Sequence, residues 1–310
     1  MMKKIKVLVT GASGFVGRNT VEHLSASGKY DVFACTDPVA DLRDAEAVRR
    51  VVGEFAPDCA VNCAAVGGTR KTAYDQGAGD VAAVNLRMFF NLLRALPPGA
   101  RLLHLGSGAE YDHRAYRHRM PEDFFDTSVP QDPYGFSKYV ISKYAAHVQS
   151  VTVLRIFGIF GKYEDYTFKF ISNAIVKNLL GLPIVINQNV VFDYLYVADF
   201  VRALELFIDR QPAHRHYNVT PSASIDLLSL AALINASSGR QSEIRVLNQG
   251  LNREYSGDNS RLTAEFPEFR FTPYAAAVKE LYEYYGRELV RLDTAAVQAD
   301  PYLKNCRTEK

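Results

Sequence analysis

The sequence predicts an α/β protein with a Rossmann-like, doubly wound parallel sheet and a smaller, interleaved α/β lobe. In the first half of the chain, short apolar runs alternate with helical patterns, which is typical of a parallel sheet buried on both faces. A glycine-rich segment at residues 11–17 also joins the first expected strand to the first expected helix. This strand–loop–helix arrangement is typical of dinucleotide-binding folds.

The apolar runs of the first half read as buried strands because they lack polar alternation and are short. The intervening segments carry apolar residues at helical spacing. The expected strands are residues 5–10, 31–35, 59–63, 101–105 and 152–156, and the expected helices are residues 16–27, 45–55, 80–96 and 134–147.

After residue 161 the alternation becomes less regular, so we expect a second, smaller unit there. The expected strands are 184–186, 194–197 and 216–219, and the expected helices are 168–180, 198–208, 225–237 and 274–285. A dinucleotide-binding unit is expected at residues 1–165, with residues 187–220 returning to it. The substrate-binding lobe then comprises 166–186 and 221–293, followed by a polar, loosely held tail at 294–310.

Composition limits the class of protein. The chain has 310 residues, a net charge of +2 and 48% hydrophobic residues, which can fill a globular core and argues against global disorder. No stretch approaches the roughly 20 apolar residues that a membrane helix needs. The near-neutral charge gives no electrostatic case for binding nucleic acid or an anionic membrane, so neither is expected as a partner.

The cysteines and histidines predict neither disulfides nor a metal site. Three of the four cysteines lie in apolar segments and none forms a CxxC pair, which favours reduced thiols in a cytoplasmic protein. The short apolar run after Lys3 and Lys4 is no signal-peptide core, so we expect no such leader. The seven histidines lack converging acidic or cysteine partners.

The glycine-rich segment reads GASGFVG, and each of its three glycines has a physical role in holding a dinucleotide. The first allows a tight turn, the second a close approach of the pyrophosphate, and the third close packing of helix on strand. The helix N-terminus adds amide donors and a partial positive charge. The residues expected to contact the cofactor are Gly11, Ser13, Gly14, Phe15, Val16 and Gly17.

Asp37 stands twenty residues after Gly17, at the end of the second expected strand. A carboxylate there accepts hydrogen bonds from the ribose hydroxyls of NAD and repels a 2′-phosphate. Because positions 34 to 39 hold no Arg or Lys, we expect NAD as cofactor and leave NADP open. Asp41 and Leu42, further along this loop, are expected to meet the adenine. An ordinary surface aspartate is the alternative for Asp37.

A second set of residues indicates proton-transfer chemistry. Tyr134 and Lys138 form a YxxxK pair on one face of an expected helix. A nearby ammonium stabilises a phenolate and so brings a tyrosine into a useful range for acid–base catalysis. Ser107 follows an expected parallel strand, at the sheet edge where ligands bind in such folds. Together with the glycine-rich segment, these residues predict a catalytic site rather than chance surface residues.

These elements together resemble the extended short-chain dehydrogenase/reductase family, over nearly the whole chain. The resemblance implies that Ser107, Tyr134 and Lys138 form the catalytic triad, and that Ala64 and Ala65 line the cofactor groove. It also implies a nucleotide-diphosphate sugar as substrate and a homodimer formed through helices 80–96 and 134–147. The segments that carry it are residues 10–17, 57–65, 84–93, 105–111, 133–138, 154–162 and 192–200.

Departures from subfamily patterns narrow the implied reaction. The AAVGG stretch at 64–68 resembles GDP-fucose synthase, but Ala109 stands where that enzyme has a cysteine and Lys169 where it has a histidine. The family's 4,6-dehydratases carry Asp-Glu where this chain has Gly108 and Ala109. What remains implied is hydride transfer at C4, by a 4-ketoreductase or, alternatively, a 4-epimerase. A non-catalytic dinucleotide-binding regulator is a distant third possibility.

The substrate contacts are less well specified. Relatives often have an arginine where this chain has Phe192, which leaves the nucleotide and the sugar undetermined. The residues considered for substrate contact are Gly67, Lys169, Lys177 and Arg253, of which Lys177 and Arg253 could equally be ordinary surface charges.

Overall fold

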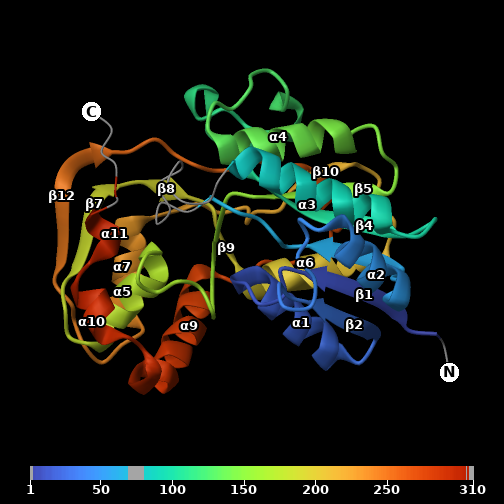
Figure 1. Ribbon diagram of the computed structural model, residues 1–310. Helices are drawn as coiled ribbons and strands as arrows, with labels where there is room; N and C mark the ends of the chain where they lie inside the picture. Colours follow the sequence, from blue (N-terminus) through green and yellow to red (C-terminus); the bar gives the residue numbers. More distant parts are fainter. Residues whose placement is uncertain (1–2, 69–79, 305, 307–310) are drawn as a thin grey trace.

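The computed structural model describes residues 3–68, 80–304 and 306, and a parallel six-stranded sheet lies at its centre. The strands have the spatial order β10-β5-β4-β3-β1-β2, and every neighbouring pair is parallel (Figure 1). This arrangement confirms the predicted α/β class with a Rossmann-like sheet. The strands are β1 (Ile5–Thr10), β2 (Tyr30–Cys35), β3 (Cys59–Asn62), β4 (Arg101–Ser107), β5 (Val151–Ile156) and β10 (His216–Asn218).

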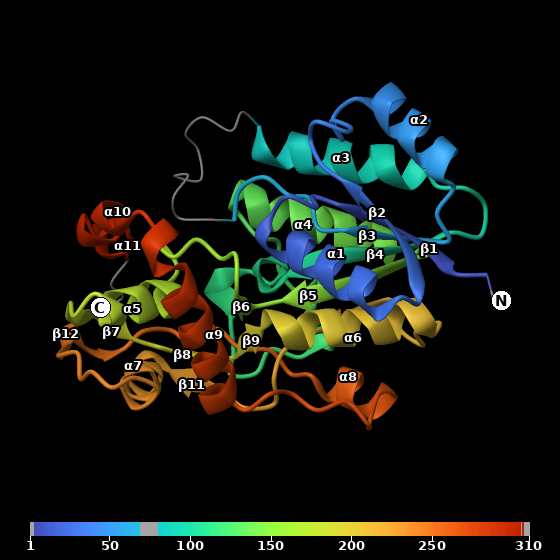
Figure 2. The ribbon, with the colours of Figure 1, turned by 90° about the horizontal axis from the view of Figure 1, so that it is seen from below.

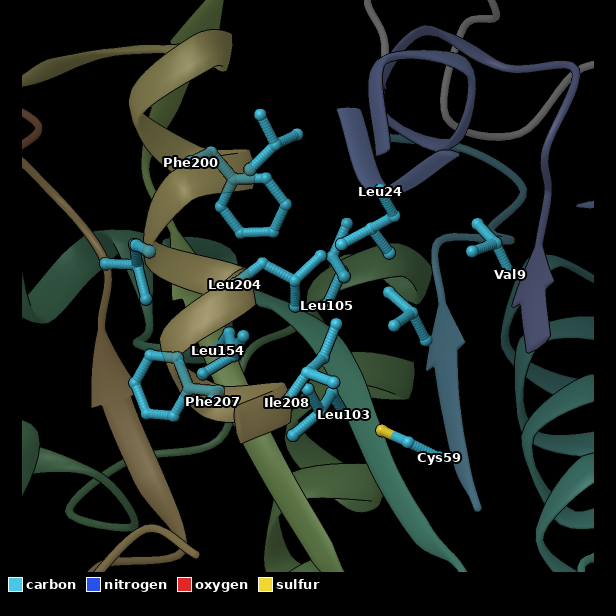
Figure 3. Close-up of a cluster of buried hydrophobic side chains, with 14 of the residues drawn as sticks. Val9, Leu24, Cys59, Leu103, Leu105, Leu154, Phe200, Leu204, Phe207 and Ile208 are labelled. Atoms are coloured by element: carbon cyan, nitrogen blue, oxygen red, sulfur yellow. The ribbon is translucent and has the colours of Figure 1, made fainter. Parts of the chain in front are cut away.

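Helices cover both faces of this sheet, because alternate residues of each strand point to opposite layers. Val7 and Val9 belong to the core under α1 and α6, whereas Leu8 packs with α2 and α3 (Figure 2). Figure 3 shows Phe200 and Leu204 of α6 directed at the strands. The covering helices are α1 (Phe15–Ser27), α2 (Ala45–Phe55), α3 (Val81–Ala95), α4 (Pro133–Ala145) and α6 (Val197–Asp209).

Aspartates begin three of these helices. The carboxylates of Asp44, Asp80 and Asp132 each accept a hydrogen bond from a backbone N–H in the first turn of α2, α3 and α4, respectively. Such caps satisfy amides that the helix itself leaves unpaired and are worth about 1 kcal/mol each. Asp132 is followed by Pro133, which favours the first helical position, so the start of α4 and therefore the place of Tyr134 are well defined.

A second hydrophobic cluster forms the small lobe, beside the carboxyl edge of the sheet (Figure 1). Its helices pack on a two-stranded parallel sheet in which β12 pairs with β7. The main elements are α5 (Phe170–Leu179), β7 (Ile184–Asn189), α7 (Leu227–Ala236), β12 (Ile244–Leu251) and α9 (Tyr274–Glu288).

Short elements connect the sheet and the lobe. Two pairs of short strands form small sheets, with β6 parallel to β9 and β8 antiparallel to β11. The sequence analysis missed β12 and α8, as well as several of the shortest elements. The missed short elements are β6 (Gly158–Phe160), β8 (Val191–Phe192), β11 (Ile225–Asp226), α8 (Ser260–Glu265), and the single turns at Gly108–Glu110, His113–Ala115, Glu122–Phe124 and Leu289–Arg291. In contrast, β9 (Tyr194–Tyr196) is the strand expected at residues 194–197.

The expectation of a loosely held tail is wrong for residues 294–304. This segment forms α10 (Thr294–Gln298) and α11 (Pro301–Lys304), and the Val297 side chain is fully buried in the core of the small lobe. Asp300 forms an ion pair with Lys177 of α5, with 2.6 Å between Oδ2 and Nζ. One buried valine and one ion pair therefore attach a segment that is polar in composition.

Candidate active site

The glycine-rich loop leaves β1 at the carboxyl edge of the sheet and leads into α1. Gly11 has a positive φ of +62°, and a Cβ there would lie 2.8 Å from the backbone nitrogen of Ala64. A Cβ on Gly17 would collide with the carbonyl oxygen of Gly11. Side chains are thus excluded at both positions, which brings the loop, the start of α1 and the end of β3 into close contact, as a dinucleotide cradle requires.

The first turn of α1 is suited to bind an anion. Gly14 is its N-cap and provides no side-chain hydrogen bond, and both Ser13 and Gly14 are exposed. The amides of Phe15 and Val16 lie in this first turn, where the helix dipole favours negative charge. The loop and the helix start therefore fit the pyrophosphate of a dinucleotide, and Ala64 and Ala65 follow β3 on the adjoining side.

The loop after β2 holds the residues expected near the adenosine. Asp37 is exposed, two residues beyond the end of β2, as its expected role requires. Asp41 is engaged by Arg43, whose Nε donates to Oδ1 over 2.9 Å, and this ion pair lowers the pKa of Asp41. Leu42 is 5% exposed and packs in the core under α2. Arg43 is a cation on this loop that the sequence argument did not weigh, and a 2′-phosphate could attract it.

Ser107 and Tyr134 come from the end of β4 and the start of α4, two elements that pack against each other. Ser107 is the last residue of β4 and its Oγ accepts a hydrogen bond from the Ala109 amide over 3.1 Å. Tyr134 lies in the first turn of α4, partly exposed. A phenol from a distant segment lies near this site: Tyr255 is hydrogen-bonded to the Ser107 hydroxyl, and, besides burial, Tyr134 is among the groups that raise the pKa of Tyr255. The segment that carries Tyr255 thus reaches the predicted serine at the end of β4.

Lys138 lies one turn after Tyr134 and is almost fully buried, with 3% of its surface exposed. Its Nζ is 5.8 Å from the centre of the Tyr134 ring and donates to the Leu105 carbonyl over 2.6 Å. Burial lowers the pKa of Lys138 to about 8, although the charge of Glu110 acts in the opposite direction. The lysine is therefore fixed beneath the tyrosine and titrates close to neutral pH.

A buried ion pair supports the serine from below. Glu110 and Arg155 are both fully buried, with 2.6 Å between Oε2 and Nε. The other carboxylate oxygen of Glu110 accepts the backbone N–H of Ser107 over 2.8 Å. Because a buried ion pair is stable only with good geometry and further hydrogen bonds, this arrangement fixes the backbone on which Ser107 stands. Sequence reasoning assigned no role to either residue.

Two glycines cover the ring of Tyr134. Gly67 and Gly68 have positive φ angles of +82° and +75°, and a Cβ on Gly68 would lie 2.7 Å from Cζ of Tyr134. The Asn85 amide holds this stretch by exchanging two hydrogen bonds with the backbone of Val66, at 2.8 and 3.0 Å. Gly67, considered for substrate contact, therefore lies beside the proposed acid–base group.

The three candidate cations have different environments. Lys177 is 4% exposed and its charge is already paired with Asp300 of the tail. Lys169 is the residue before α5 and is half-buried. Arg253 is exposed and donates to the His113 carbonyl over 2.6 Å. Of the three, Arg253 lies nearest in sequence to Tyr255, on the segment that reaches Ser107.

Asp193 anchors this segment. It is 1% exposed, and its Oδ2 accepts the backbone N–H of Gly257 over 2.6 Å. Burial raises the pKa of Asp193 to about 8, against hydrogen bonds from Thr220 and Gly257. Tyr255 is fixed at the site by this carboxyl group, and nothing in the local sequence around residue 255 signals that contact.

Two further kinds of site were sought within residues 3–68, 80–304 and 306. No group of three His, Cys, Asp or Glu side chains in this part of the chain is arranged to hold a metal ion. Its helices are all too short or too polar to span a membrane.

A glycine cradle, an anion-binding helix start and a Ser–Tyr–Lys set at the carboxyl edge of a parallel sheet define a dinucleotide-dependent oxidoreductase fold. The chain belongs to the NAD dependent epimerase/dehydratase family, whose model matches residues 7–220. The resemblance to extended short-chain dehydrogenases is thereby confirmed, and so is the expectation of NAD as cofactor, with NADP left open.

Relatives and solved structures agree with this assignment. GDP-6-deoxy-D-talose 4-dehydrogenase of Aggregatibacter actinomycetemcomitans is 24% identical over 90% of this chain and 97% of its own length. The fold is similar to UDP-glucose 4-epimerase of Thermotoga maritima, with a TM-score of 0.78 and 20% identity over 92% of this chain and 100% of the other. It is also similar to dTDP-4-dehydrorhamnose reductase of Bacillus anthracis in complex with NADP, with a TM-score of 0.76 and 18% identity over 92% and 99%.

Proposed function

We propose that the protein is an NAD(P)-dependent oxidoreductase that acts at C4 of a nucleotide-diphosphate sugar, as a 4-ketoreductase of an NDP-4-keto-6-deoxyhexose. Support comes from the similarity to a 4-dehydrogenase and a 4-dehydrorhamnose reductase along nearly the full chain. The alternative is an NDP-sugar 4-epimerase, which the similarity to UDP-glucose 4-epimerase keeps open.

The observation that carries this proposal is the chemistry next to Ser107. A side chain at Gly108 has no room, because a Cβ would lie 2.5 Å from Cδ1 of Phe157 and 2.6 Å from Oη of Tyr255. The next position is Ala109, which offers only a methyl group. The positions that directly follow the serine thus provide no carboxyl or thiol group for eliminating water or moving protons at carbon. Hydride transfer with protonation of oxygen is the chemistry that the site supports.

Each member of the triad has a defined task in this reaction. A bound nicotinamide would supply the hydride to C4. Tyr134 donates its phenolic proton to the sugar O4 as negative charge develops there, and Ser107 donates a hydrogen bond to the same oxygen. The Lys138 ammonium stabilises the phenolate that Tyr134 becomes. The Gly11–Ala64 contact and the first turn of α1 hold the cofactor against this edge.

The test is a stoichiometry measurement on the purified protein. NDP-4-keto-6-deoxyhexoses are offered with NADH and, in parallel, with NADPH, and cofactor oxidation is compared with the sugar product. One reduced cofactor consumed per sugar supports the 4-ketoreductase. Redox-neutral interconversion of two 4-epimers with retained cofactor would instead establish the epimerase. Turnover by Tyr134→Phe at the wild-type rate contradicts the catalytic assignment in either case.

We also propose that the protein forms a homodimer through α3 and α4, where aromatic side chains are exposed. Phe136 and Tyr144 are 39% and 43% exposed on α4, where Phe90 of α3 packs edge-on to Tyr144 at 4.9 Å. An aromatic surface shared by two helices is suited to bury against a second copy. Light scattering should give the mass of a dimer for the wild type and of a monomer for Tyr144→Glu.

A further inference from the structure

A line of buried polar side chains crosses the sheet beneath the site, from β1 to α4. Its members are 0 to 3% exposed and come from the carboxyl ends of β1 and β3, from the middle of β4 and from the first turns of α4. They are Thr10, Asn62, His104 and Lys138. Buried polar groups of this kind must satisfy one another, so the direction of each hydrogen bond can be worked out.

The orientation of the Asn62 amide is fixed by a backbone donor. Its oxygen lies 3.3 Å from the Ala64 nitrogen, whose N–H can only donate, and accepts from the Thr10 hydroxyl over 2.8 Å. The NH₂ group of Asn62 therefore faces His104 and lies 3.1 Å from Nδ1. Since an amide NH₂ only donates, Nδ1 of His104 is the acceptor and its ring proton is on Nε2.

The Nε2–H tautomer of His104 affects the protonation of Lys138. Nε2 of His104 lies 3.4 Å from Nζ of Lys138. An ammonium has three donors and no acceptor, so an N–H directed at it makes no hydrogen bond. A neutral amine has a lone pair and can accept that N–H, while still donating to the Leu105 carbonyl 2.6 Å away. The imidazole therefore favours the amine form of the lysine.

We infer that His104 is a positioning residue that, as its neutral Nε2–H tautomer, lowers the proton affinity of Lys138 and so sets the pH range in which the Tyr134–Lys138 pair works. The dependence of activity on this pair rests on the proposed function, whereas the tautomer does not.

The other groups around Lys138 agree with this assignment. Burial and the lysine charge hold the pKa of His104 well below its ordinary value, so the ring stays neutral. Burial raises the pKa of Cys63 to about 12, so its thiol also stays neutral near pH 8. The Glu110 carboxylate favours the ammonium but is ion-paired with Arg155. Lys138 thus has no direct carboxylate partner among these groups, and its pKa is lowered to about 8.

The first test reads the tautomer in the cofactor-free protein. Nitrogen chemical shifts of isotope-labelled histidine distinguish a protonated from an unprotonated ring nitrogen, and a His104 variant assigns the signal. We expect a protonated Nε2 and an unprotonated Nδ1 that do not titrate between about pH 6 and pH 9. A protonated Nδ1 or a titrating ring would overturn the inference, whatever substrate the enzyme takes.

The second test uses two variants of different chemistry. His104→Gln presents a carbonyl oxygen to which an ammonium can donate, so the alkaline limb of kcat/KM should move upward by about one pH unit. His104→Phe removes the N–H but keeps a ring against Phe89, whose ring lies 5.1 Å from that of His104. Its limb should move upward less than that of the Gln variant.

The outcomes separate the inference from the proposed function. The alkaline limb of kcat/KM could instead lie at the same pH in the wild type and in both His104 variants, with only the rate reduced. That result would show that His104 acts through packing alone, and it would contradict the inference. If no nucleotide sugar is turned over, the proposed function fails, and the histidine spectrum alone decides the inference. Melting temperatures of the two variants establish that the compared proteins are folded.

Discussion

Two buried glutamates, one in the sheet body and one at the small lobe, are accommodated in different ways. Glu110 is fully buried beneath Ser107 and is ion-paired with the equally buried Arg155. Glu164 is 6% exposed, beside α5, and receives a hydrogen bond from the Ser172 hydroxyl. Burial raises the pKa of Glu164 to about 8, so at neutral pH it is largely a neutral acid. The body thus keeps a buried carboxylate charged by pairing it with an arginine, whereas the lobe holds this glutamate as a neutral acid.

The different treatment of the two glutamates agrees with what the body and the lobe each contribute to the site. The body contributes the proposed catalytic side chains from a strand end and a helix start, and a buried ion pair holds the backbone of Ser107. The lobe contributes side chains through longer segments, such as the one that brings Tyr255 to Ser107. We expect substitutions of Tyr134 or of the Glu110–Arg155 pair in the body to abolish the reaction or weaken the fold. Substitutions in the lobe should change the pH dependence of stability and the binding of substrate.

The largest effect is expected for Tyr134→Phe in the body. The substitution removes the proposed proton donor while keeping the ring that Gly67 and Gly68 cover. The rate constant kcat should fall roughly 10²–10⁴-fold, the usual contribution of a general acid. Titration with NADH should give an unchanged dissociation constant, which separates a chemical loss from a misfolded site. A loss of less than tenfold would remove Tyr134 from the reaction.

The second-largest effect is expected on the stability of the body, when the Glu110–Arg155 ion pair is broken. Glu110→Gln leaves the Arg155 guanidinium buried without its anion, which should lower the free energy of unfolding by about 3–5 kcal/mol. Urea unfolding followed by circular dichroism measures this change. Replacing a surface carboxylate, as in Glu46→Gln, should change the same quantity by less than about 1 kcal/mol. Equal effects of the two substitutions would refute the structural role of the buried pair.

The stability of the small lobe should decrease as the pH rises, because Glu164 is buried as a neutral acid. The pKa of Glu164 is about 8 when folded and 4.5 in its ordinary state, so the protonated acid stabilises the fold below about pH 4.5. This contribution is lost as pH rises towards 8, and the same direction applies to Asp193. Glu164→Gln should therefore be more stable than the wild type at pH 8, by roughly 1–3 kcal/mol, with little gain at pH 5. Melting curves at both pH values are the check, and a gain that is the same at both would contradict it.

The smallest effects should separate two candidate cations of the lobe. Arg253→Met should raise KM for a nucleotide sugar roughly tenfold, if the exposed guanidinium meets the diphosphate. Lys177→Met should leave KM within about twofold, because its ammonium is paired with Asp300. Steady-state kinetics of both variants distinguishes the roles. The reverse pattern would assign the diphosphate to Lys177 and require the tail contact to open.

Local patterns were sufficient to predict the body. The glycine cradle, the strand ends and the YxxxK pair depend on neighbours within a few residues, and in the structure Ser107 ends β4 while Tyr134 lies in the first turn of α4. The lobe follows long-range contacts that no local pattern carries. β12 is mostly exposed and has no regular apolar alternation, and the segment around Tyr255 is held by distant residues, with Asp193 bonded to Gly257 and Val191 to Tyr255. The tail is attached through the buried Val297, the ring of Tyr302 and the Asp300–Lys177 ion pair, which composition does not reveal.

The central claim is that this site transfers a hydride to C4 of a nucleotide-linked sugar and protonates its oxygen. The most direct test is the number of cofactor molecules oxidised per NDP-4-keto-6-deoxyhexose reduced, with a deuteride-labelled cofactor tracing where the label arrives. The account predicts one cofactor per sugar and deuterium at C4, in wild type and not in Tyr134→Phe. Deuterium at another carbon, or sugar conversion without net cofactor oxidation, would contradict it.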